Sequence, residues 1–231
     1  SGEWIAFLDS DDTWEKDKLK IQMMELANLN YNPYVVIHGD CFVYHEEKNE
    51  KTIWHLPLTE GFCYDLLLKR PSPAFPAILT SKKALLEIGL LDESIISYQE
   101  WDTSIMLSKL CRFIHIKEPL FTYFIHSGER ISKNNKNNII GYIQIVKKYE
   151  DIIKKKGYLN FHAMKIISEA IEYNLIEEVY PFLSSLELDK IRRSLLYYVY
   201  YFSKFPILSK EIKKKLIRRV IKKFQDMLTL K

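Results

Sequence analysis

Glycine and cysteine are scarce in this chain of 231 residues. Only seven residues are glycine and none belongs to a glycine-rich run, which excludes a phosphate-binding loop of that kind. The three cysteines, Cys41, Cys63 and Cys111, lie far apart and form no CxxC pair. Neither a disulfide framework nor a zinc knuckle is therefore expected, and a reducing cytosol fits this cysteine usage best.

Long apolar runs are also missing. No stretch of about 18 consecutive apolar residues occurs, so the sequence predicts no membrane-spanning helix. Hydrophobic residues make up 47% of the chain and charged residues 28%, an ordinary globular balance, and 15 Tyr and 12 Phe argue against disorder. The length allows one full domain and a smaller one.

Basic charge is concentrated at one end of the chain. Residues 210–231 hold nine Lys or Arg against two acids, a net of +7 within a total of +4, so the remaining residues carry −3. Apolar residues recur there at four-residue steps, at Ile212, Leu216, Val220 and Phe224. This pattern predicts a basic amphipathic helix at 209–228 that contacts an anionic membrane surface. A helix packed on its own domain is the alternative, and no nucleic-acid-binding module accompanies the charge.

Two regions differ in pattern. Residues 1–133 alternate short apolar runs with amphipathic stretches and predict a mixed α/β domain. Residues 134–231 predict a helical C-terminal region with the basic tail at its end. Its expected helices cover about 139–156, 160–180, 188–203 and 209–228, with breaks near Gly157, Pro181 and Pro206.

Several elements of the α/β region are predicted individually. A helix is expected at 16–30, and its apolar residues at helical spacing are Leu19, Met23, Leu26 and Leu29. Strands are expected at 75–79, 113–116 and 120–125. Ser81 is expected to cap a helix at 82–88 that Gly89 ends.

Three carboxylates follow the first apolar run directly. Asp9, Asp11 and Asp12 come after the predicted strand at 4–8, and ligand sites of open α/β sheets lie at the carboxyl ends of strands. Their mutual repulsion is relieved by a divalent cation, and oxygen ligands suit Mg²⁺ or Mn²⁺. A solvated acidic turn without a metal is the other interpretation.

An alternative enzyme class also places acids after a strand. Asp9, Asp11 and Thr13 match the DxDxT signature of haloacid-dehalogenase-like phosphatases. That class needs a second acidic pair downstream, and Gly39-Asp40 has no acid four residues further on. A metal-dependent phosphatase is therefore the weaker interpretation.

The acidic segment and its surroundings resemble glycosyltransferase family 2. Residues 2–14 read GEWIAFLDSDDTW, which is similar to that family's GEYIAFLDADDxW. The resemblance covers residues 2–133 and implies a partial GT-A fold, a Rossmann-like mixed sheet, with a helical appendage. It further implies an inverting transfer of sugar from a nucleotide-sugar donor, a UDP-sugar, to a glycan or lipid-linked acceptor. By this resemblance Asp9 faces the ribose of the nucleotide, Asp11 binds the metal and Asp12 supports the metal site.

The resemblance places the catalytic base at residues 100–102. An inverting transfer requires a carboxylate that takes the proton of the attacking hydroxyl. Residues 88–93 and 97–102 resemble the family's approach to that base, so Glu100 is the expected base and Asp102 the alternative. At a helix start, the helix dipole is expected to favour the ionised form of Glu100.

The last predicted site residues come from two other segments. His126 ends a run that resembles the family's YRxH strand end, and is expected to complete the metal shell. Residues 61–80 resemble an acceptor-side segment, with contacts expected at Pro73 and Ala74. Trp101 is expected either to stack on an acceptor sugar or to pack in the core.

Two features of the family are absent from this sequence. Its opening strand, VSVIIPTYN, and its DDxS turn grip the nucleotide base. We therefore expect that upstream residues are missing, that the chain is inactive alone, and that an inactive scaffold is a further alternative. The predicted role is synthesis of a surface polysaccharide, and the predicted location is cytoplasmic and peripheral at the inner face of the cell membrane.

Overall fold

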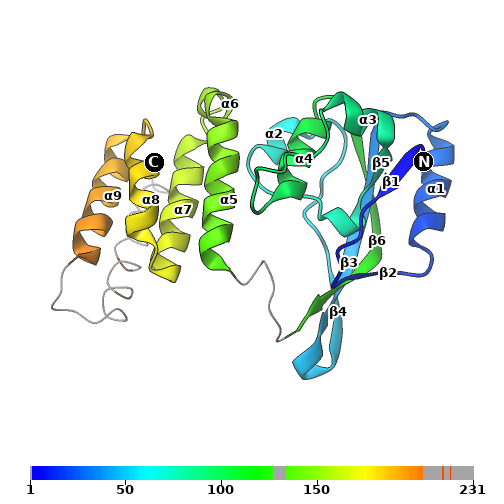
Figure 1. The fold of residues 1–231 in the computed structure, drawn as a ribbon, viewed down its shortest axis with the longest axis horizontal. Coiled ribbons are helices and arrows are strands. Elements are labelled where there is room, and N and C mark those ends of the chain that lie inside the picture. Colours follow the sequence, from blue (N-terminus) through cyan, green and yellow to red (C-terminus); the bar gives the residue numbers. More distant parts are fainter. Residues whose placement is uncertain (1, 127–133, 205–214, 216–218, 220–231) are drawn as a thin grey trace. The chain divides into compact units, whose positions relative to one another are not determined.

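The computed structural model describes residues 2–126, 134–204, 215 and 219. Its contacts divide the chain into two compact units, Ser1–Arg130 and Ile131–Lys231. The first unit is a mixed α/β structure and the second, where described, is helical. The predicted fold class is confirmed: a mixed, partly Rossmann-like sheet is followed by C-terminal helices (Figure 1).

A six-stranded mixed sheet organises the first unit. In spatial order its main path is β1 (Trp4–Ala6), β5 (Leu79–Ser81), β3 (Val35–His45), β6 (Arg112–Ile125) and β2 (Thr13–Trp14), with β4 (Glu50–Trp54) paired to β3 after the short η1 (Glu46–Lys48). Strand β3 runs parallel to β6, and every other pairing is antiparallel. Because β1 and β2 lie at opposite ends of this path, the acidic segment between them links the two ends.

Helices lie on both faces of this sheet (Figure 1). One face carries α1 (Lys18–Asn28), and the other carries α2 (Tyr64–Leu67) and α4 (Gln99–Leu107). Helix α3 (Lys82–Glu87) follows β5 directly, and the Ser81 side chain accepts the Ala84 N–H at 2.9 Å. Gly89 follows the helix with φ +87°, so the predicted cap and terminator are both confirmed.

Two strand predictions were wrong. Residues 75–79 begin with the short 3₁₀ helix η2 (Phe75–Ala77), because Pro76 has a fixed φ and no N–H to give to a sheet. Residues 113–125 belong to one strand, because β3 pairs with this strand along its length. A register shift at Gly39 and Asp40 lets the pairing continue past residues 117 and 118. A Cβ at Gly39 would come within 2.7 Å of the Ile116 carbonyl oxygen, so glycine permits this close approach.

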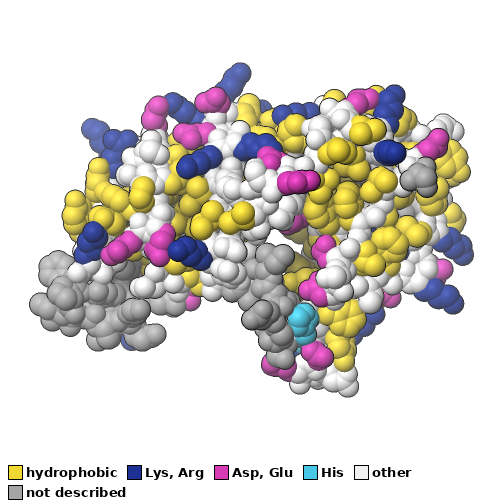
Figure 2. Space-filling model, in the orientation of Figure 1, with side chains coloured by type: hydrophobic (Ala, Val, Ile, Leu, Met, Phe, Trp, Pro, Cys, Tyr) yellow, Lys and Arg dark blue, Asp and Glu magenta, His cyan; other side chains and the backbone are white. Residues whose placement is uncertain are grey.

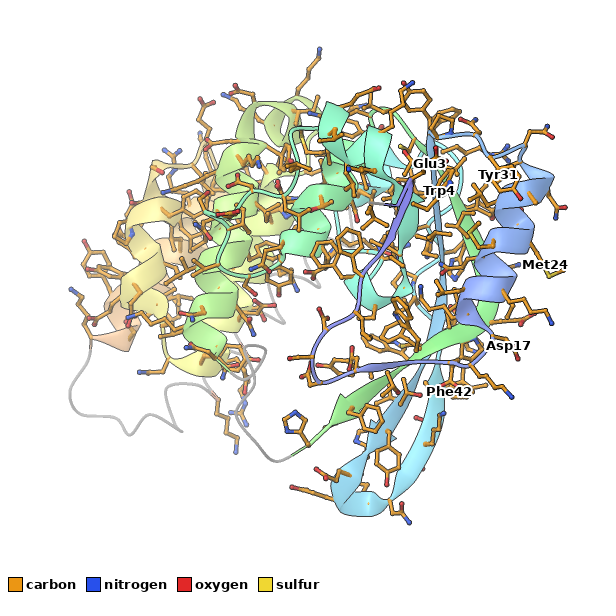
Figure 3. All side chains as sticks on the ribbon, turned by 45° about the vertical axis from the view of Figure 1, so that its right-hand side comes forward. Glu3, Trp4, Asp17, Met24, Tyr31 and Phe42 are labelled. Atoms are coloured by element: carbon orange, nitrogen blue, oxygen red, sulfur yellow. The ribbon has the colours of Figure 1, made fainter. Side chains whose placement is uncertain are left out.

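The face of α1 that packs on the sheet also differs from the prediction. Lys18, Gln22 and Leu26 are its buried residues, at four-residue spacing, whereas Leu19 and Met23 are exposed. Met24, which is exposed as well, projects from the outer side of α1 in Figure 3. The apolar residues of the helix did not predict its buried face, because two long polar side chains occupy that face.

The described part of the second unit is built from helices. These are α5 (Asn135–Lys148), α6 (Glu150–Lys155), α7 (Leu159–Tyr173), α8 (Ile176–Ser185) and α9 (Lys190–Ser203). The predicted break at Pro181 was wrong: α8 continues through it, and the chain turns instead at Asn174, whose φ is +59°. Burial of Val179, Phe182 and Leu183 stabilises the helix around the proline. The predicted helix at 209–228 lies outside the described residues. Among the described helices, none has the length and apolar character needed to cross a bilayer.

Candidate functional site

The acidic segment forms a turn held from two sides. The Asp12 N–H donates to the Asp9 carbonyl at 3.2 Å, which closes the turn. The indole N–H of Trp14 donates to the Phe7 carbonyl at 3.0 Å, just before the turn. We call residues 9–12 the acidic turn. Asp9 and Asp11 are exposed in it, whereas Asp12 is buried.

Asp12 uses one carboxylate oxygen to hold the turn against the sheet. Its Oδ1 accepts the backbone N–H of Phe124 at 3.2 Å, near the end of β6. Asp12 therefore links the acidic turn to the end of β6, a role that the sequence did not predict.

The pKa of Glu100 is influenced by the acidic turn. Burial raises its pKa to about 6, the backbone hydrogen bond opposes this, and the negative charge of Asp9 raises it further. The pKa of Asp9 is raised too, by partial desolvation and by the charge of Asp11. The backbone hydrogen bond at the helix start lowers the pKa of Glu100, in the expected direction, but burial is the larger influence and raises it.

Asp102 does not share this position. It lies two residues beyond Glu100 in α4, and side chains two apart on a helix project in nearly opposite directions. The side chain of Asp102 is buried. The geometry therefore favours Glu100 over Asp102 as the carboxylate that meets the turn.

His126 lies beside the acidic turn. Its Nε2 lies 3.7 Å from Oδ2 of Asp11, and both side chains are partly exposed. Figure 2 shows a histidine near acidic side chains at the foot of the α/β unit. A carboxylate oxygen and an imidazole nitrogen suit Mn²⁺, and Mg²⁺ is commonly held by one or two carboxylates together with substrate phosphates.

The metal-ligating side chains of the described residues form no complete metal site by themselves. Among residues 2–126 and 134–204, no three His, Cys, Asp or Glu side chains are arranged to hold a metal ion. The observed set fits a metal with Asp11 and His126 as its protein ligands. Asp12 follows Asp11 in the chain, and its Oδ1 accepts the Phe124 N–H.

The predicted acceptor segment lies beside the strand that precedes the turn. The rings of Phe7 and Phe75 stack with centroids 4.6 Å apart. Pro73 is buried and Ala74 is partly buried in this segment. Trp101 is fully buried, and its indole N–H donates to the Leu67 carbonyl at 2.5 Å, so the structure supports its packing alternative.

Sequence reasoning missed two polar residues beneath the site. Lys18 and Gln22 are buried and hydrogen-bonded to each other at 2.6 Å. The available signal was their four-residue spacing with Leu26, which places all three on one helix face. The apolar residues beside them obscured that signal.

Three other histidines of the first unit make hydrogen bonds away from the acidic turn. His115 and His55 both bond to the buried carboxylate of Asp40, at 2.9 and 2.6 Å, and His38 bonds to the Thr59 carbonyl. Burial lowers the pKa of His38 to about 4, which keeps it neutral. This cluster joins the segment after β4 to the sheet.

One comparison with known proteins bears on function. A curated protein of Haemophilus influenzae named "Uncharacterized glycosyltransferase" is 26% identical over 240 residues, which cover 95% of this chain and 69% of that protein. No protein-family profile matches the chain. The similarity supports a glycosyltransferase, and such an enzyme uses in general a nucleotide-sugar donor and an acceptor.

Proposed function

We propose that this chain carries the metal-binding and acceptor-binding parts of an inverting GT-A glycosyltransferase of family 2. The donor is a UDP-sugar and the acceptor is a glycan or a lipid-linked glycan in surface polysaccharide synthesis. The observation that carries the proposal is that Asp9, in the turn after β1, lies near enough to Glu100, at the start of α4, for its charge to raise the pKa of Glu100. The similarity to a named glycosyltransferase supports it independently.

Glu100 is the proposed general base. A pKa of about 6 leaves its carboxylate mainly ionised at pH 7, yet basic enough to accept the proton of an attacking hydroxyl. General bases work best when their pKa lies near the working pH. Partial burial of Glu100 therefore serves the chemistry, although it disfavours the charged form.

The acidic turn is the proposed donor side. Asp9 would face the ribose of the donor, and Asp11 and His126 would hold Mn²⁺ or Mg²⁺. Such a cation supplies positive charge to a leaving diphosphate. Asp12 orients the turn through its bond to the Phe124 N–H. Pro73 and Ala74, next to the stacked Phe75, are the proposed acceptor contacts.

The function is tested by measuring UDP release. The full-length protein is incubated with Mn²⁺, a panel of UDP-sugars, and oligosaccharide or polyprenyl-linked acceptors. We expect at least one donor to release UDP, faster with an acceptor and not after EDTA treatment. Release of phosphate from a phosphate ester without any sugar acceptor would instead favour the phosphatase. Absence of both activities would favour an inactive scaffold.

We also propose that the protein is cytoplasmic and binds the inner face of the membrane through residues 209–228. The support is the net charge of +7 in residues 210–231. Each basic residue near an anionic surface contributes about 1 kcal/mol, and salt screens this attraction. The full-length protein should sediment with vesicles that contain phosphatidylserine and should be released by salt. Equal sedimentation with neutral vesicles would exclude the electrostatic contribution.

A further inference from the structure

Helix α1 begins with a buried lysine. Lys18 is 1% exposed, and its Nζ donates to Oε1 of Gln22 at 2.6 Å and lies 4.6 Å from the centroid of the Trp14 ring. Buried lysines normally pair with a carboxylate. The described residues give Lys18 no such partner, and burial lowers its pKa to about 8, so it remains mainly charged at pH 7. An amide oxygen and an aromatic face stabilise the cation instead.

Lys18 fixes the orientation of the Gln22 amide. Because Oε1 of Gln22 accepts from a cation, the Nε2 group must point the other way, and both of its N–H groups have acceptors. These are the carbonyl oxygens of Ile37, at 2.9 Å, and of Ala77, at 2.8 Å. Gln22 therefore ties the central strand β3 to the end of η2.

The two contacts of Lys18 lead to the two sides of the candidate site. On one side, the Trp14 ring beneath Lys18 donates its N–H to the Phe7 carbonyl, two residues before Asp9. On the other, Gln22 holds Ala77, which ends the segment 72–77. The two sides also meet directly, through the stacked rings of Phe7 and Phe75.

We propose that Lys18 and Gln22 are positioning residues that hold the acidic turn and the segment 72–77 in a fixed relation. Of these two segments, Gln22 holds only the segment 72–77, through its bond to Ala77. Lys18 holds that segment through Gln22, and it holds the acidic turn through Trp14. The consequence for catalysis rests on the proposed glycosyltransferase function, whereas the mechanical coupling does not.

Hydrogen–deuterium exchange of the full chain tests the coupling. Lys18→Met keeps an unbranched side chain, one atom shorter and without the charge. Gln22→Glu keeps an acceptor for Lys18 but removes both amide donors. Lys20→Met, at an exposed lysine of the same helix, is the matched control. Lys18→Met should accelerate exchange about 10-fold in residues 7–12 and 72–78, since a buried hydrogen-bonding group loses its partner. Gln22→Glu should accelerate exchange in residues 72–78 only. Lys20→Met should leave exchange unchanged in both segments.

Two results would overturn the proposal. Uniform acceleration throughout residues 2–126 in Lys18→Met would show that the lysine only stabilises the core. Unchanged exchange in both segments would show that no coupling exists. Helices α5–α8 of the second unit provide an internal reference that should not change.

Enzyme kinetics give a second readout. In the full-length protein, Gln22→Glu should raise the KM for the acceptor about 10-fold while changing kcat less than about 3-fold. A loss of kcat without a change in KM would contradict a positioning role. If wild-type protein uses no nucleotide sugar, the proposed function fails, but the exchange experiment still decides whether Lys18 couples the two segments.

Discussion

The negative charge of Asp9 helps to raise the pKa of Glu100, although the two residues lie far apart in the sequence. Asp9 follows the edge strand β1, and Glu100 is in the first turn of α4. The fold thus brings a turn suited to a metal and diphosphate close to a carboxylate suited to proton transfer. In the proposed function the acceptor hydroxyl is deprotonated beside the bound donor, and this pairing would serve that step.

The pH dependence of turnover should follow Glu100. A base works only when deprotonated, so kcat/KM should fall as the pH drops through about 6. The measurement is UDP release between pH 5 and 8 with saturating Mn²⁺. A profile that stays flat between pH 5 and 7 would contradict this role of Glu100.

The same residue should reduce stability at neutral pH. Its folded pKa, about 6, lies above the ordinary value of 4.5, so the folded state binds the proton more tightly than the unfolded state. The favourable contribution is complete below about pH 4.5 and is lost as the pH rises through 6. Glu100→Gln removes the buried charge and should stabilise the protein at pH 7 by up to about 2 kcal/mol.

Urea denaturation at several pH values measures this effect. The stability gain of Glu100→Gln should shrink toward pH 4.5 and should be present at pH 7. Glu93→Gln, at an exposed glutamate of the same region, should leave stability unchanged at every pH. A destabilised Glu100→Gln at pH 7 would show that the carboxylate makes favourable contacts that outweigh its desolvation.

Metal affinity should depend on the pair formed by Asp11 and His126. Asp11→Asn and His126→Gln should each weaken Mn²⁺ binding about 10–100-fold, because each removes one of two protein ligands. Asp12→Ala should instead lower stability by about 1 kcal/mol, since the Phe124 N–H loses its acceptor. Electron paramagnetic resonance with Mn²⁺ and a nucleoside diphosphate measures the affinities. A larger loss of affinity in Asp12→Ala than in Asp11→Asn would reverse this assignment.

The sequence predicted the fold class and several of its elements, because the spacing of apolar residues and the cap residues depend only on nearby sequence. The run at 4–8, the cap at Ser81 and the glycine at position 89 each specify their own surroundings. The long strand at 112–125 was missed because its continuity depends on pairing with β3, which no local pattern encodes. The inner face of α1 was missed for a related reason, since Lys18 is buried only because Gln22 and Trp14 surround it.

The sequence named candidate site residues but could not give their geometry. The sequence pointed to Asp9, Asp11, Glu100 and His126, and the structure brings these into two interacting pairs. It could not show that Asp12 bonds to the Phe124 N–H, because that contact joins segments distant in the chain. Nor could it determine that burial, rather than the helix start, dominates the pKa of Glu100.

The most direct test compares sugar transfer by Glu100→Gln and Glu93→Gln in the full-length protein. The account predicts that Glu100→Gln lowers kcat about 10²–10⁴-fold at pH 7, with Mn²⁺ and UDP binding retained, while Glu93→Gln keeps wild-type turnover. Wild-type turnover in Glu100→Gln would contradict the central claim that this carboxylate removes the proton of the acceptor.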